Sequence, residues 1–176
     1  MRLILRAGSL ATLIAVLSLN GCSPAFRLAS DAANGDVAAV KADLAKTPVD
    51  APSFLFDGDT ALGVAAHHGR FQVVKVLLAA GAKVDAGSGG ATPLMDAASG
   101  SAAGGDYPGV VAALISAGAD PNAKDEGGRT PLAFAVIVGR NPAVVPILAK
   151  AGAQVNAIEV GGKTPLSWAA WNGDVQ

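Results

Sequence analysis

Two short motifs recur along this chain in a fixed order, and this repetition constrains the fold more strongly than any other feature. A threonine with a leucine two residues after it occurs four times, at Thr60, Thr92, Thr130 and Thr164. The copies are separated by 32, 38 and 34 residues, and proline follows the threonine in the last three. A glycine-alanine pair with Asp or Asn three residues after the alanine follows the first three copies, in residues 81–85, 118–122 and 152–156. Two motifs that recur together with one period indicate an array of similar structural units.

One unit of the array is predicted to be a pair of helices joined by a glycine. The Thr60 hydroxyl is placed to cap a first helix, and proline at the next position of the later copies suits a first helical turn. Gly69 is placed to end this helix, and apolar residues at helical spacing from Val73 to Leu78 predict a second one. Only 5% of the residues are aromatic, so alanine and leucine must supply the core. A single helix pair cannot bury its apolar face, so neighbouring units must stack on it.

These motifs resemble the ankyrin repeat, which has a period of about 33 residues and Thr-Pro-Leu at the start of its first helix. The resemblance implies an all-α fold, a helix-turn-helix solenoid with β-turn or hairpin connections. It implies a divergent capping repeat at residues 29–53 and further repeats at about 54–86, 87–123 and 124–157. An incomplete repeat follows at 158–176. Residues 173–176 match the start of a second helix whose remainder is absent, so we expect a truncated chain or a fragment.

The chain departs from the family pattern at three further places. The histidine that usually follows Thr-Pro-Leu is replaced by Gly63, Met95, Ala133 and Ser167, so its hydrogen bonds between turns are expected to be missing. Residues 99–109 are too many for one inter-helix connection and are rich in glycine, which predicts a mobile loop. Pro142 and Pro146 flank the start of a second helix, and Pro146 is compatible with that helix only in its first turn.

The N-terminal segment has the features of a bacterial lipoprotein signal. Arg2 and Arg6 precede an apolar run over residues 10–19, which is shorter than the ~20 residues that span a bilayer. Residues 19–22 resemble a lipobox, and Cys22, the only cysteine, would become the acylated N-terminus after cleavage. We therefore predict a signal peptide at 1–21, lipidation of Cys22 and a short linker at 22–28. The alternatives are an uncleaved membrane anchor and a cysteine placed there by chance.

The predicted anchor sets the expected location. In Gram-negative lipoproteins, which this N-terminus resembles, a residue other than aspartate after the cysteine favours the outer membrane, and here that residue is Ser23. We expect a lipid-anchored protein of the bacterial cell envelope, on the outer membrane and facing the periplasm. Because the linker is short, a protein partner is expected in the same envelope.

Neither nucleic-acid binding nor catalysis is indicated. The net charge is −1 and no basic stripe is present, whereas nucleic-acid binding needs one. His67 and His68 lie near Asp57 and Asp59 in the sequence, which suggests a metal or acid–base site. Adjacent histidines on a helix point about 100° apart, however, and helical metal ligands prefer wider spacing. We interpret the histidines as surface residues and expect no enzyme, no cofactor, no metal and no small-molecule substrate.

The resemblance implies a concave protein-binding face made of turn tips and first-helix ends. Carried over position by position, it predicts these protein-binding residues: Phe56, Asp57, Asp59, His67, His68, Glu126, Arg129, Ile137, Val138, Lys163 and Trp171. Phe56, Arg129 and Trp171 are the predicted anchors, since interfaces favour aromatic and arginine side chains. The alternative is structural: Ile137 and Val138 would pack on a neighbouring unit, and Trp171 would belong to an uncovered end.

The predicted function is that of a periplasm-facing lipoprotein that binds another protein as a scaffold or accessory factor. An inhibitor or immunity factor for an envelope-active toxin or hydrolase is the alternative within the same class. An enzyme and a purely structural envelope protein are the remaining hypotheses. Repeat surfaces share a frame and differ in the residues that choose a partner, so the sequence leaves the partner unnamed.

Overall fold

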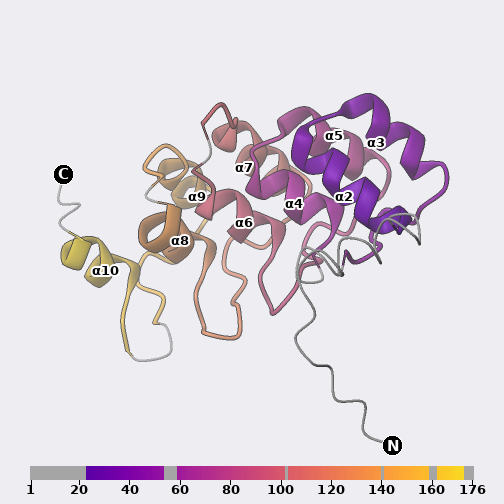
Figure 1. The fold of residues 1–176 in the computed structure, drawn as a ribbon. Helices are drawn as coiled ribbons and strands as arrows, with labels where there is room; N and C mark the ends of the chain where they lie inside the picture. The colour runs from indigo at the N-terminus through magenta and orange to yellow at the C-terminus, as the bar shows by residue number, and fades with distance from the viewer. Residues whose placement is uncertain (1–22, 54–58, 102, 140, 159–161, 173–176) are drawn as a thin grey trace, which may run out of the picture.

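The computed structural model describes residues 23–53, 59–101, 103–139, 141–158 and 162–172. These residues form a stack of helix pairs that runs from α2 and α3 at the right of Figure 1 to α10 at the left. One row holds the first helix of each unit: α2 (Pro24–Asn34), α4 (Ala61–His67), α6 (Pro93–Ser99), α8 (Pro131–Phe134) and α10 (Pro165–Asn172). The other row holds the second helices: α3 (Val37–Leu44), α5 (Phe71–Ala79), α7 (Tyr107–Ser116) and α9 (Val145–Lys150). Each helix contacts the next one in its own row. The predicted all-α solenoid is confirmed.

Threonine starts the first helix in four of the units. The Thr60 hydroxyl accepts from the Gly63 amide at 3.2 Å, and the same contact recurs in the later units, at Thr92, Thr130 and Thr164. Proline occupies the first turn of the helices that follow the last three of these threonines, where its missing N–H leaves no hydrogen bond unmade. The caps therefore fix where each first helix begins.

Two of the residues that replace the usual histidine make hydrogen bonds of their own. Met95 Sδ accepts from the Thr92 amide at 3.4 Å, and Ser167 Oγ accepts from the Thr164 amide at 2.9 Å. These contacts complete reciprocal caps at the starts of α6 and α10. At these two helix starts, the expected loss of hydrogen bonds between turns is thus partly offset by hydrogen bonds within the turn.

Neighbouring units are linked by the last residue of the second recurring motif and by Asp50, at the equivalent position of the first unit. The Asp50 carboxylate accepts from the Lys83 amide at 2.9 Å, and Asn122 Oδ1 accepts from the Gln154 amide at 2.7 Å. Asp85 makes the equivalent contact with the Asp120 amide at 3.4 Å. In each case the acceptor comes from one unit and the amide from the next, so the motif fixes the register of the stack.

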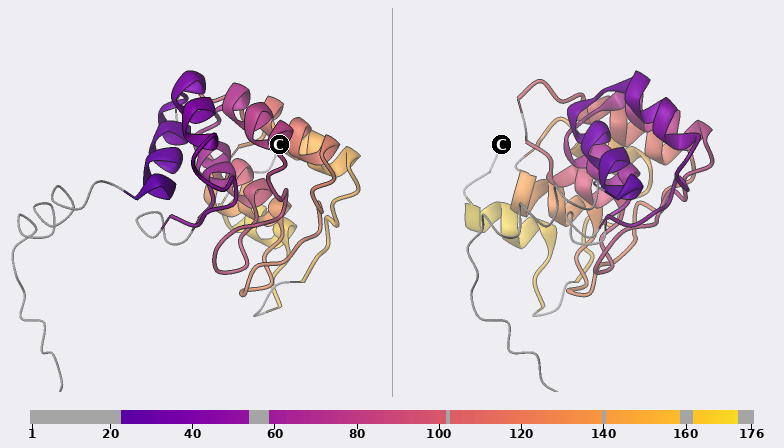
Figure 2. Two further views of the ribbon diagram at one scale, coloured as in Figure 1. Left: turned by 90° about the vertical axis from the view of Figure 1, so that its right-hand side faces the viewer. Right: turned by 45° about the vertical axis from the view of Figure 1, so that its right-hand side comes forward.

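The core is a continuous layer of leucine, valine and alanine between the two rows. Leu62 and Leu94 are fully buried on the first helices, as are Leu77 and Leu114 on the second helices. Fully buried alanines such as Ala97 let neighbouring helices approach closely. The described connections from α5 to α6 and from α7 to α8 extend to the same side of this layer (Figure 2). No helix within the described ranges is long and apolar enough to cross a bilayer.

The connection between α6 and α7 differs from the predicted loop. Helix α7 begins at Tyr107, so Pro108 and Gly109 lie in its first turn, capped by the Asp106 carboxylate. The connection also packs on the preceding unit, because the Asp106 amide donates to the Gly69 carbonyl at 3.0 Å. The left-handed Gly69 lies so close to this connection that an added Cβ would be 2.6 Å from a backbone carbon of Gly105. The loop is therefore shorter than predicted and is held by backbone contacts.

One other boundary differs from the sequence prediction, and the start of α9 agrees with it. Helix α2 begins at Pro24, with Ser23 as its cap, so the predicted linker at 22–28 is mostly helical. Helix α8 continues into a π-helical turn at Ala135–Gly139. Pro146 lies in the first turn of α9, which is the only place where that helix tolerates it.

Leucine at the third position of the recurring motif provides a matched test of stacking. Leu94 is fully buried, whereas Leu166, at the same position of its unit, is 69% exposed. We expect Leu94→Ala to lower the free energy of unfolding by about 2–5 kcal/mol, because it leaves a cavity in the core. Leu166→Ala should cost less than ~1 kcal/mol. Chemical denaturation of both variants checks this, and equal losses would contradict the observed stack.

Candidate protein-binding surface

In the last two units, side chains at two repeat positions, five residues apart in the sequence, contact each other. The first position precedes the capping threonine and ends a turn, and the second lies in the following first helix. In two successive units a cation from the turn stacks on an aromatic ring from the helix. The Arg129 guanidinium lies 4.7 Å from the centre of the Phe134 ring, and Lys163 Nζ lies 3.8 Å from that of Trp168. Helices α8 and α10 are in contact, so the two pairs belong to adjacent units of the stack.

The last helix adds a second indole to this arrangement. Lys163 Nζ lies 5.4 Å from the centre of the Trp171 ring, which belongs to the next turn of α10. Trp171 is 78% exposed. We call the set formed by Arg129, Phe134, Lys163, Trp168 and Trp171 the cation-aromatic surface.

Arg129 is fixed within the cation-aromatic surface by an ion pair. Its Nη2 lies 2.6 Å from Asp125 Oδ2, and its Nε donates to the same oxygen at 2.8 Å. The other Asp125 oxygen accepts from the Arg129 and Gly127 amides, which closes the turn. Glu126 is exposed at the tip of this turn. The arginine predicted as an anchor therefore contributes a rigid, charge-paired platform.

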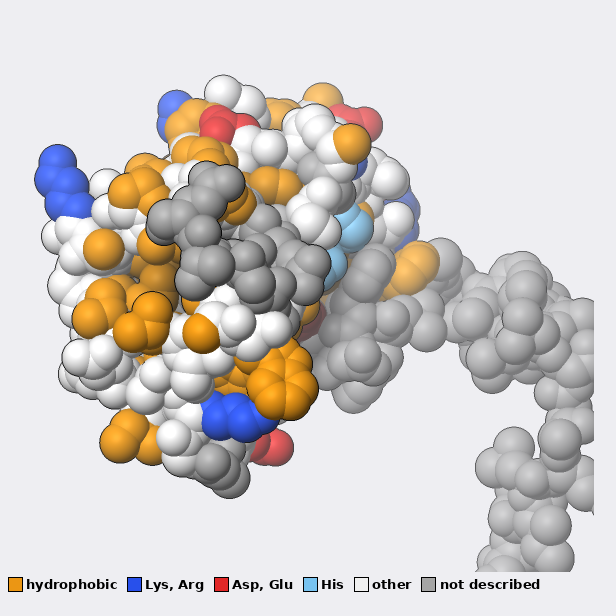
Figure 3. All heavy atoms as spheres, turned by 90° about the vertical axis from the view of Figure 1, so that its left-hand side faces the viewer, with side chains coloured by type: hydrophobic (Ala, Val, Ile, Leu, Met, Phe, Trp, Pro, Cys, Tyr) orange, Lys and Arg blue, Asp and Glu red, His pale blue; other side chains and the backbone are white. Residues whose placement is uncertain are grey.

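Exposed apolar side chains gather at the same end of the molecule. Within the described residues the large hydrophobic side chains that are most exposed all lie in the last third of the chain, at Val138, Val155, Ile158, Leu166 and Trp171. Figure 3 views this end and shows hydrophobic side chains spread over it, with a blue basic side chain lying against one of the largest. Of the predicted pair in the π-helical turn, Val138 is exposed and Ile137 is half-buried.

Two aspartates occupy these repeat positions in units nearer the N-terminus. Asp59 precedes α4 and Asp96 lies in α6, and both carboxyl groups flank Gly63, where an added Cβ would lie 3.0 Å from Asp96 Oδ2 and 3.5 Å from Asp59 Oδ1. Burial, and then the neighbouring Asp59 charge, raises the pKa of Asp96 to about 8. Asp96 is therefore mostly protonated at pH 7. Glycine in place of the family's histidine makes room for this pair.

The two histidines lie apart from the carboxyl pair. His67 and His68 lie at the C-terminal end of α4, whereas Asp59 precedes its N-terminal end. The length of the helix, about 10 Å, therefore separates the histidines from Asp59. Their ring centres are 5.3 Å apart and the rings meet edge to face. Burial, followed by the charges of His67 and Arg70, lowers the pKa of His68. Among the described residues, no group of three or more His, Cys, Asp or Glu side chains could hold a metal ion.

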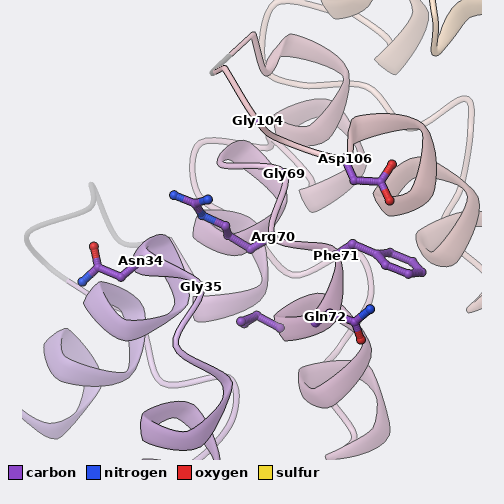
Figure 4. Close-up of a pocket in the computed structure, with 9 residues that line it drawn as sticks. Asn34, Gly35, Gly69, Arg70, Phe71, Gln72, Gly104 and Asp106 are labelled. Atoms are coloured by element: carbon purple, nitrogen blue, oxygen red, sulfur yellow. The ribbon is translucent and has the colours of Figure 1, made fainter.

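A separate groove of about 350 Å³ lies where the first three units meet, at the joints between first and second helices. Figure 4 shows Arg70 between Asn34 and the connection at Gly104. Arg70 Nε donates to the Ala33 carbonyl of the preceding unit at 2.8 Å. Arg70 thus joins two units, and we interpret the groove as a seam of the stack.

Three predicted residues fall outside the described ranges, namely Cys22, Phe56 and Asp57. Two members of the site were not predicted as binding residues: Phe134 and Trp168. Asp96 was not predicted either. Alignment of the repeats could have found them, because the turn residue and the helix residue each occupy one position of the repeat. The turn position holds Asp59, Ala91, Arg129 and Lys163, and the helix position holds Val64, Asp96, Phe134 and Trp168.

The fold defines a class, the helical repeat solenoid. A family model described as ankyrin repeats (3 copies) matches residues 26–125 and 101–176, which is most of the chain. The chain belongs to the ankyrin-repeat family. Proteins of this family typically bind other proteins, and the repeats imply a protein partner here.

A curated relative supports the same assignment over part of the chain. An ankyrin repeat and KH domain-containing protein of Caenorhabditis briggsae is 46% identical over 76 residues. The match covers 43% of this chain and 3% of the relative. The similarity is therefore to a small part of a much longer protein.

The carboxyl pair predicts an unusual pH dependence of stability. Asp96 has a raised pKa in the folded chain, so between about pH 4 and pH 8 folding takes up a proton, and stability falls as the pH rises through this window. Asp96→Asn cannot ionise and should lose this slope, which makes it more stable than the wild type by a few kcal/mol at pH 8. Thermal melts from pH 4 to pH 9, with Glu126→Gln as the exposed control, measure it. A variant that keeps the wild-type slope would rule out a neutral Asp96.

Proposed function

We propose that this protein binds another protein through the cation-aromatic surface and acts as a scaffold or accessory factor in the bacterial envelope. The observation that carries the proposal is the exposure of Trp171, which is 78% exposed beside Lys163 and the half-buried Trp168. A tryptophan left in water forgoes the burial of a large apolar area. Tryptophan and arginine are also the residue types most enriched among binding hot spots.

The surrounding surface supports a macromolecular partner. Leu166 and Ile158 are 69% and 64% exposed at the same end of the stack. Several large apolar side chains exposed at one end of a domain are typical of an interaction site. The two ring-stacked cations hold the aromatic side chains in fixed positions, so less side-chain entropy is lost when a partner orders them.

The proposed location rests on the N-terminal sequence and on the position of the first helix. Helix α2 begins at Pro24, two residues after Cys22, and Ser23 Oγ accepts from the Phe26 amide at 3.2 Å. A lipid on Cys22 would therefore hold the stack within a few residues of the membrane, each spanning at most ~3.5 Å. Such a tether favours a partner in the same envelope. We propose an outer-membrane lipoprotein that faces the periplasm and has no enzymatic activity of its own.

The binding role predicts a partner that is lost on substitution at one end of the stack. After crosslinking in intact cells, wild-type protein should recover a discrete envelope protein, and Trp171→Ala should recover at least about tenfold less. Lys75→Ala, on the exposed side of α5, is the matched control and should behave as wild type. Recovery that is unchanged in Trp171→Ala would refute this surface. If the recovered protein is a toxin or hydrolase that binding inactivates, the chain is an inhibitor.

The anchor predicts covalent lipid on a single residue. Cells grown with labelled palmitate should incorporate label into wild-type protein and none into Cys22→Ser, because Cys22 is the only cysteine. The variant should also leave the membrane fraction, since the acyl chains supply the membrane affinity. An unlabelled wild-type protein would remove the lipoprotein part of the proposal and leave the binding part standing.

A further inference from the structure

Charge is segregated along the stack. Residues 23–126 contain 12 acidic and 7 basic side chains, a net charge of −5, whereas residues 127–176 contain 2 acidic and 4 basic side chains, a net charge of +2. The cation-aromatic surface lies wholly in the second segment. Such a separation of charge produces a field that steers an acidic partner to the C-terminal end and repels it from the N-terminal half.

Lys163 is the cation on this surface that is available to a partner. It is exposed, and no carboxylate of the described residues lies within ion-pair distance of it. Its ammonium group is held instead over the Trp168 and Trp171 rings. Arg129 differs, because Asp125 neutralises it. A ligand carboxylate that reaches Lys163 would therefore meet an indole face on the same approach.

Acidic residues at the equivalent positions of the other units increase the selectivity of the surface for one register of the ligand. At these positions the units nearer the N-terminus present Asp59, Ala91 and Asp96, in place of a cation and an aromatic ring. An acidic segment lying along the face would pair with Lys163 beside α10 and would meet like charge at Asp59. The favourable register is thus confined to the C-terminal end of the stack.

We propose that the ligand of the cation-aromatic surface is an acidic protein segment with an aromatic or large aliphatic side chain next to its carboxylates. This rests on the proposed protein-binding function and specifies the chemistry of its partner. The apolar side chain packs on the exposed face of Trp171, and a neighbouring Asp or Glu pairs with Lys163. Such a charge pair at the edge of an apolar contact adds register and selectivity to the affinity.

The test is a selection of short random peptides on the immobilised full-length chain, followed by titration of the selected peptides. Both tryptophans of the chain belong to this surface, so intrinsic fluorescence reports binding there directly. We expect selected peptides that combine acidic with aromatic or aliphatic residues, and an affinity that falls with salt. Lys163→Glu and Trp171→Ala should each weaken binding by about tenfold or more. The charge-reversal control Lys75→Glu on α5 should leave the affinity unchanged.

The outcomes separate this inference from the proposed function. Peptides that need Trp171 but are basic or uncharged would overturn the acidic partner and leave protein binding intact. Peptides whose binding ignores both Lys163→Glu and Trp171→Ala would refute the surface itself. Sedimentation of the full chain alone provides the remaining test, because self-association that Lys163→Glu abolishes would assign the surface to a second copy and overturn the inference.

Discussion

The structure depends on one constraint, which is that each first helix must bury its leucine and alanine face against the neighbouring unit. Leu94 has neighbours on both sides and is fully buried, whereas Leu166, at the same repeat position, is 69% exposed on α10. No second helix follows α10 within the described residues. The same sequence pattern thus gives a core residue where units flank it on both sides, and an exposed residue on α10, which packs on one neighbouring unit among the described residues. Aligned units then follow from the hydrogen bonds of Asp50, Asp85 and Asn122 across three successive junctions.

Two positions of each unit vary in chemistry along the stack, and in the last two units they form the cation-aromatic surface. The threonine, the leucine and the motif-ending Asp or Asn are needed for caps, core and register. The turn residue before the threonine and the helix residue five positions later vary more widely, and at Val64 the helix residue is buried in the core. They hold a carboxyl pair toward the N-terminus, at Asp59 and Asp96, and stacked cation-ring pairs toward the C-terminus. The frame therefore stays constant while the charge and shape of the face change along it.

The sequence predicted the frame well because its signals are local. A threonine cap, a helical period and a glycine stop each act within one turn of helix, so the starts of α4, α6 and α10 followed from a few residues. The loop between α6 and α7 was predicted less well, because contacts from Gly69 and from the Asp106 cap shorten it.

The site was predicted only in part, because the contacts that form it join different elements and are not local in the sequence. Arg129, Lys163 and Trp171 were chosen one at a time, but their pairing with Phe134 and Trp168 bridges a turn and a helix, and the helical period does not reveal it. The neutral state of Asp96 depends on burial and on Asp59 in another unit, and neither can be read from the neighbouring residues.

The most direct test of the account is a photoreactive residue placed at position 171 in the living cell. We expect one discrete crosslinked protein from position 171 and none from position 75, on the exposed side of α5. Adducts from position 75 alone would contradict it, because they would place the partner on the second-helix row. Position 171 is the better probe because its side chain is the most exposed of the large hydrophobic residues that the structure describes.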